Sequence, residues 1–157
     1  MATQIFVNLP VKDLNKSKEF FEKLGFSFNP QFTNDQGACL IIGENIFAML
    51  LIEPFFKTFT KKEIADAKKT TEALIAIDAE SRQSVDEMVR KAVEAGGSTY
   101  RDADDHGWMY AHSFADPDGH QWEVLYMDKS KIPQQMWNES HAICNSFMNE
   151  YFLIIKL

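Results

Sequence analysis

Four histidines and two cysteines are the residues of this chain best suited to do chemistry. His112 lies within residues 108–114, which predict a β-strand, and period-two alternation places it on the same face as Trp108 and Tyr110. An imidazole that points from this face into an interior could transfer protons, whereas a core histidine satisfied by a neighbour is the simpler interpretation. His120 falls in a tight turn, where local hydrogen bonding is the expected role.

The other candidate nucleophiles indicate little reactivity. Cys39 lies in an apolar run without a basic neighbour, which is typical of a small core residue. His141 and Cys144 form only a single His-x-x-Cys pair. The sequence has no glycine-rich phosphate loop, no Gly-x-Ser-x-Gly elbow and no His-Glu-x-x-His helix. Nucleotide chemistry and serine hydrolysis are therefore not indicated.

Composition and charge narrow the possible partners. The 157 residues are 45% hydrophobic and 25% charged, as in a soluble globular domain, and their formal net charge is −7. This charge repels phosphate backbones and anionic lipid, so we expect neither nucleic acid nor a membrane as partner. Two cysteines are too few for a disulfide scaffold, and residues 1–4 do not begin a signal peptide. We therefore expect a cytoplasmic protein.

The elements that must position these residues occur twice in the same order. The first stretch predicts a strand, a helix and three strands, at residues 5–9, 14–24, 26–28, 38–42 and 46–52. The second stretch repeats this order at residues 73–77, 81–93, 98–100, 108–114 and 122–127. A unit with one helix cannot cover both faces of its sheet, so two units should pair their sheets around a shared interior. The expected fold class is α+β, with two βαβββ units forming a cup-shaped mixed sheet.

This repeat divides one domain into four parts. They are a first unit at 1–53, a connecting loop at 54–71, a second unit at 72–128 and a C-terminal extension at 129–157. The loop carries five lysines and three phenylalanines, and loops of this length in compact domains are usually lids or linkers. We predict that it is mobile and gates the interior. The extension could cap the fold, cap a partner subunit or pack against nothing.

Two segments carry a resemblance to a known family. Residues 9–26 begin with Leu-Pro-Val-Lys-Asp-Leu and end with Leu-Gly-Phe, and residues 114–124 place Asp-Pro-Asp-Gly-His before Gln-Trp-Glu-Val. Together they resemble the glyoxalase, bleomycin-resistance and extradiol-dioxygenase superfamily, also called the vicinal oxygen chelate superfamily. The resemblance covers residues 2–127, and it implies a glyoxalase/bleomycin-resistance-like cup and a homodimer.

The resemblance also implies metal ligands at four pseudo-symmetric places, on the first and last strand of each unit. In this sequence those places are Phe6, Phe47, Glu72 and Glu123. A metal held for Lewis-acid catalysis normally has three or more protein donors, and a phenyl ring donates nothing. The carboxylates of Glu72 and Glu123 alone would hold a hard divalent ion only weakly.

This departure favours a binding protein of the resistance or sequestration type. We expect it to hold a small hydrophobic or cationic molecule between its halves, without a cofactor or strong metal ligation. The expected ligand contacts are Phe6, Phe47, Glu72, Trp108, Tyr110, His112 and Glu123. The alternative is a glyoxalase- or dioxygenase-like enzyme in which Glu72 and Glu123, joined by His112, bind a divalent metal ion. The sequence identifies neither the ligand nor a catalytic residue.

Overall fold

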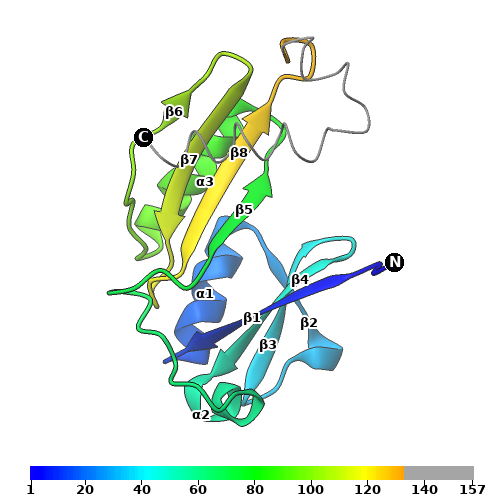
Figure 1. Ribbon diagram of the computed structural model, residues 1–157, viewed down its shortest axis with the longest axis vertical. Helices are drawn as coiled ribbons and strands as arrows, with labels where there is room; N and C mark the ends of the chain where they lie inside the picture. Colours follow the sequence, from blue (N-terminus) through cyan, green and yellow to red (C-terminus); the bar gives the residue numbers. More distant parts are fainter. Residues whose placement is uncertain (133–157) are drawn as a thin grey trace.

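A computed structural model describes residues 1–132, and these form two βαβββ units in chain order (Figure 1). The first unit contains β1 (Ile5–Val11), α1 (Leu14–Leu24), β2 (Ser27–Asn29), η1 (Pro30–Phe32), β3 (Gly37–Gly43) and β4 (Ile46–Ile52). The second contains β5 (Leu74–Asp78), α3 (Arg82–Glu94), β6 (Asp104–Asp105), β7 (Met109–Ala115) and β8 (Gln121–Met127). The short helices α2 (Glu53–Phe56) and η2 (Lys57–Phe59) open the connecting loop. Most of the expected C-terminal extension lies outside the described residues.

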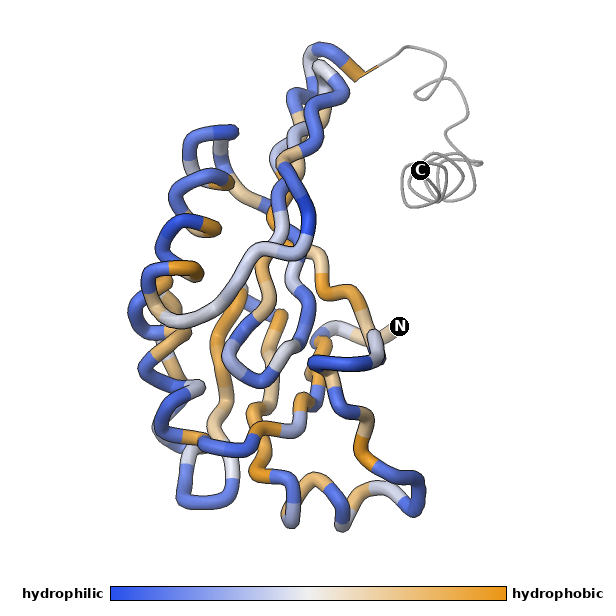
Figure 2. Tube along the Cα trace, turned by 90° about the vertical axis from the view of Figure 1, so that its left-hand side faces the viewer, coloured by the Kyte–Doolittle hydropathy of each residue, from blue (hydrophilic) through white to orange (hydrophobic). Residues whose placement is uncertain are grey.

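Each unit forms a four-stranded mixed sheet with the same topology. The strand orders are β1-β4-β3-β2 and β5-β8-β7-β6. In both sheets the first strand pairs parallel with the last, and the other pairs are antiparallel. The α+β class with two βαβββ units is therefore confirmed. The helices α1 and α3 contact each other and lie on one side of the two sheets (Figure 2).

Capping residues set the bounds of both long helices. The Asp13 carboxylate accepts a hydrogen bond from the Lys16 backbone N–H at 3.1 Å, and Gly25 ends α1 in the left-handed region at φ 101°. The Ser81 hydroxyl accepts a hydrogen bond from the Ser84 backbone N–H, and Ser81 is the N-cap of α3. The two helices have 11 and 13 residues, and no helix within residues 1–132 is long and apolar enough to cross a membrane.

The core is shared between the units. Phe20 and Phe21 of α1 pack against Phe114 of β7 and Trp122 of β8, and all four side chains are at most 1% exposed. The ring centroids lie 5.3 Å apart for Phe21 and Trp122, and 6.0 Å apart for Phe20 and Phe114. Because aromatic side chains bury the largest apolar areas, this cluster joins the two halves of the repeat in one hydrophobic core.

Two predicted strands differ in the structure. The first strand, predicted to end at residue 9 before Pro10, continues to Val11 in β1. Proline is tolerated there since β1 is an edge strand that pairs only with β4. The predicted strand at 98–100 is reduced to an isolated bridge between Ser98 and Ala115, and the edge of the second sheet is instead β6.

Candidate functional site

Phe6 and Phe47 form an aromatic pair on the open face of the first sheet. They are register partners on β1 and β4, and their rings stack at a centroid distance of 5.0 Å and an interplanar angle of 16°. Their neighbours Val7 and Ala48 belong to the core packed around α1, so by alternation both rings leave the sheet on the opposite face. Phe6 is 51% exposed. The pair therefore presents ring surface to solvent.

Glu123 lies on the open face of the second sheet. Its neighbours Trp122 and Val124 are buried in the core on the α3 side, so the Glu123 side chain leaves from the other face, beside its β7 partner Ser113. Burial, together with the negative charge of Glu123, raises the pKa of Tyr100 to about 12. Both helices lie on one side of the sheets (Figure 2), so the face of the second sheet that carries Glu123 and the face of the first sheet that carries the phenylalanine pair are both on the other side.

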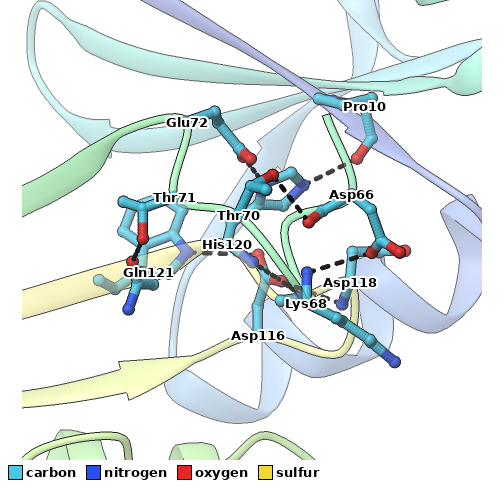
Figure 3. Close-up of polar contacts among 12 residues, drawn as sticks. Pro10, Asp66, Lys68, Thr70, Thr71, Glu72, Asp116, Asp118, His120 and Gln121 are labelled. Carbon is cyan, nitrogen blue, oxygen red and sulfur yellow. Dashed lines mark hydrogen bonds and ion pairs between the residues drawn. The ribbon is translucent and has the colours of Figure 1, made fainter. Parts of the chain in front are cut away.

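Glu72 lies apart from this open face. It precedes β5, and its carboxylate forms an ion pair with Nδ1 of His120 (Figure 3). The β5 partner of Glu123 is Ala76, whereas the β1 partner of Phe47 is Phe6. In the second sheet, the position equivalent to Phe6 by strand register is therefore Ala76 and not Glu72.

Tyr110 and His112 face α3 and not the open face. The Tyr110 hydroxyl donates to the Asp86 carboxylate on α3 at 2.7 Å, and the Arg82 guanidinium lies 5.2 Å from the centroid of the Tyr110 ring. His112 lies beside α3 residues in a groove, and its Nδ1 is buried without a hydrogen-bond partner. The His112 side chain therefore lies on the α3 side of β7, although His112 also lines a small pocket together with Ser113 and Glu123.

Trp108 precedes β7, and its carbonyl accepts a hydrogen bond from the Asp128 backbone N–H at 2.7 Å. Its side chain is partly buried. Of the seven expected ligand contacts, the structure thus brings Phe6 and Phe47 together and turns Glu123 to the same side of the molecule. Glu72 instead pairs with His120, Tyr110 bonds to α3, and His112 lies beside α3 while sharing a small pocket with Glu123.

The residues at the four family positions do not fit a metal centre. Phe6 and Phe47 offer no lone pair, and Glu72 is held by His120. Within the described part of the chain, no three or more His, Cys, Asp or Glu side chains are grouped so that they could share an ion. Three or more such donors are the usual minimum for a catalytic divalent metal.

The turn at residues 116–120 is organised by Asp116, which is buried. One carboxylate oxygen accepts from the backbone N–H groups of Asp118, Gly119 and His120 at 3.0, 3.0 and 3.1 Å. The other accepts from the Trp122 indole N–H at 3.2 Å, which ties the turn to the shared core. Burial raises the pKa of Asp116, and the charge of His120 and the hydrogen bonds from the Trp122 indole and the His120 backbone oppose that rise.

His120 is 3% exposed and bonds through both ring nitrogens. Nε2 lies 2.7 Å from the Pro10 carbonyl oxygen, and Nδ1 pairs with the Glu72 carboxylate. Since both partners are acceptors, both nitrogens donate and the ring is an imidazolium. Burial alone would lower the pKa of His120, but the charge of Asp116, the Pro10 carbonyl and the Glu72 carboxylate outweigh it and raise the pKa above its usual value. Sequence reasoning expected only a local role here.

Two clefts flank the last part of the connecting loop. One, of about 380 Å³, lies beside Pro10, Asp118 and His120. The other, of about 410 Å³, lies beside Gly97 and Gln121. Neither cleft is lined by the phenylalanine pair or by Glu123, so the candidate ligand site and the turn are separate places on the molecule.

Comparison with known proteins agrees with this fold. The family model described as Glyoxalase/Bleomycin resistance protein/Dioxygenase superfamily matches residues 4–124. Hypothetical protein SA1046 from S. aureus is 29% identical, with a TM-score of 0.68 over 80% of this chain and 94% of that chain. A glyoxalase-related enzyme from Fulvimarina pelagi is 22% identical, with a TM-score of 0.67 over 79% of this chain and 88% of that chain.

A glyoxalase/bleomycin resistance protein/dioxygenase family enzyme from Burkholderia phytofirmans PsJN is 15% identical, with a TM-score of 0.64 over 76% of this chain and 94% of that chain. No curated protein matches the sequence. The family model spans both βαβββ units and includes the turn at residues 116–120. The chain therefore belongs to the glyoxalase/bleomycin resistance protein/dioxygenase superfamily.

Proposed function

We propose that this protein binds a small hydrophobic or cationic molecule on the open faces of its two sheets, without strong metal ligation. The observation that carries the proposal is the stacked pair of the exposed Phe6 and the half-buried Phe47, at places where the family resemblance implies metal ligands. Covering exposed aromatic surface with a ligand removes it from water and lowers the free energy of the complex. The faces of phenyl rings also attract cations.

Glu123 gives the second sheet the charge that a cation would need. Its side chain turns to the same side as the phenylalanine pair, and the net charge of the chain is −7. A ligand with an apolar part and a positive group would place the first on the rings and the second toward the carboxylate. The alternative of a metal-dependent enzyme lacks a group of three donors within residues 1–132.

Two probes test this proposal, one cationic and one neutral. Metal-free bleomycin is a cationic molecule with a planar aromatic part, chosen because the family description includes bleomycin resistance. Nile red is an uncharged apolar dye. We expect saturable binding of at least one probe, measured by calorimetry or fluorescence. Phe6→Ala should weaken that binding about tenfold, which corresponds to about 1.4 kcal/mol.

Matched variants separate the site from general surface effects. Phe32→Ala removes a ring that is 64% exposed on η1, outside the pair, and should leave binding unchanged. Glu123→Gln should weaken bleomycin and spare Nile red, whereas Glu94→Gln, at the end of α3, should affect neither probe. Absence of saturable binding of both probes, or equal losses in Phe6→Ala and Phe32→Ala, would contradict the proposal.

Metal content gives an independent test. Because Phe6 and Phe47 cannot ligate and Glu72 is engaged by His120, we expect protein purified without chelators to hold far less than one divalent metal ion per chain after dialysis. Elemental analysis measures this directly. One nickel, zinc, iron or manganese ion retained per chain would favour the enzyme alternative.

A further inference from the structure

The turn at residues 116–120, called here the clasp turn, belongs to the second unit but bonds to the first (Figure 3). Asp118 accepts a hydrogen bond from the Lys12 backbone N–H at 3.0 Å and another from the Ser17 hydroxyl at 2.9 Å. His120 donates to the Pro10 carbonyl at 2.7 Å. These three bonds join residues that are 101 to 110 positions apart, and all come from one five-residue turn.

Residues 66–72, which comprise the end of the connecting loop and the residue that follows it, are called here the strap and lie across the other side of the clasp turn. The approach is so close that a Cβ atom on Gly119 would lie 2.8 Å from the Lys68 backbone nitrogen and 2.9 Å from the Ala67 carbonyl carbon. The Thr71 hydroxyl hydrogen-bonds Gln121 at 2.7 Å, just after the turn. With the ion pair of Glu72 and His120, the clasp turn is held between the first unit and the strap.

The other major contact between the units, the shared aromatic core, is less directional than these hydrogen bonds. The shared aromatic core lies on the helix side of the sheets, and hydrophobic packing has little directional preference. Hydrogen bonds weaken steeply when their angles change. The two sheets are separate in their pairing, since β1 and β5 are both edge strands. The directional contacts of the clasp turn are therefore suited to fix one sheet relative to the other.

We propose that the clasp turn sets the orientation of the two sheets, and that Asp118 and His120 are positioning residues for the ligand site. This inference rests on the proposed function of the open faces. The phenylalanine pair belongs to the first sheet and Glu123 to the second, so a ligand that contacts both needs a fixed relation between the sheets. The side chains of Asp118 and His120 themselves point to the first unit and the strap.

Spin-label distances test the orientation without any ligand. Cysteines introduced at Glu44, in the turn before β4, and at Arg90, on the exposed side of α3, report on the two units in a full-length Cys144→Ser background. Cys39 is 2% exposed and remains in place. Asp118→Ala should shift or broaden the distance distribution measured by pulsed electron resonance. Asp118→Asn keeps a carbonyl acceptor and should change it less.

Asp128→Ala is the matched control, because the Asp128 carboxylate bonds only to Ser130 and Lys131 of its own turn among the described contacts. It should leave the distance distribution as in the parent. A distribution for Asp118→Ala that matches the parent would overturn the proposal, and the partial effect of Asp118→Asn keeps the test valid if the alanine variant folds poorly.

Probe binding supplies the second measurement. Asp118→Ala should weaken the better probe about three- to tenfold although Asp118 lies outside the ligand faces, while Asp128→Ala should not. If the parent binds neither probe, the proposed function fails and the distances alone decide on the clasp turn. If probe binding is normal in Asp118→Ala and the distances are unchanged, the clasp proposal fails and the proposed function stands.

Discussion

Gly119→Ala is expected to lower the free energy of unfolding by about 3 kcal/mol or more, from two costs that add. Gly119 has φ +102°, and a left-handed conformation costs an alanine about 1–2 kcal/mol relative to its ordinary regions. The new methyl group would also lie 2.8 Å from a backbone nitrogen of the strap, and forcing extra volume into a packed place costs about 1–3 kcal/mol. Backbone atoms cannot turn aside as a side chain can, so the strap must move.

Gly96→Ala is the matched control for this change. Gly96 has φ +103°, but a Cβ atom there would meet nothing within 4 Å. It therefore carries the conformational cost without the contact, and we expect a loss of about 1–2 kcal/mol. Urea denaturation of the two variants and the parent measures both losses. Equal losses would show that the strap does not press on the clasp turn.

His120→Leu is expected to lower the free energy of unfolding by about 3 kcal/mol at pH 6, near the lower end of the range for breaking a buried ion pair. The estimate is at the lower end because Glu72, whose side chain is 25% exposed, can turn to water. The Pro10 carbonyl and the buried Asp116 carboxylate lose their positive neighbour. His106→Leu, which removes a partly exposed histidine paired with Asp104, should cost less than about 1 kcal/mol.

His120 also makes the free energy of unfolding of the parent protein depend on pH, and the direction follows from its raised pKa. The pKa of His120 is higher in the folded protein than its usual 6.5, so its stabilising effect is fully present below 6.5 and is lost as pH rises through the folded pKa. The pKa of Asp116 is raised as well, and its effect has the same sign but begins near pH 3.8. Denaturation series above pH 6 should therefore show a falling stability in the parent and a flatter profile in His120→Leu. Parallel profiles would contradict the imidazolium assignment.

Local patterns in the sequence were sufficient to predict the βαβββ repeat but not the contacts between its copies. Helical spacing predicted a helix at residues 14–24, and α1 has these bounds. The partners of His120 lie in other segments, with Pro10 110 positions away, and no local pattern reports such a separation. The end of β1 was missed because tolerance for Pro10 depends on which edge of the strand is paired, a property of the sheet and not of the segment.

For the candidate site too, local patterns predicted part of the arrangement, and the rest depended on contacts between distant segments. Alternation correctly gave Tyr110 and His112 a common face, but it does not say which face packs on a helix. A signal was present, since Phe114 has the same phase as His112 and a large apolar residue favours the helix side. Comparison with Trp122 and Glu123 on β8 would have indicated the same choice.

The shared aromatic cluster means that the two copies of the repeat are no longer self-sufficient. Phe20 and Phe21 are encoded in the first copy, and the surfaces that cover them, Phe114 and Trp122, are encoded in the second. A chain cleaved within the connecting loop would yield two fragments, each of which exposes to water the apolar side chains that it contributes to the shared core. The residues on the open faces can therefore differ between the copies, with stacked phenylalanines on one and Glu123 on the other, while neither copy forms a complete core by itself.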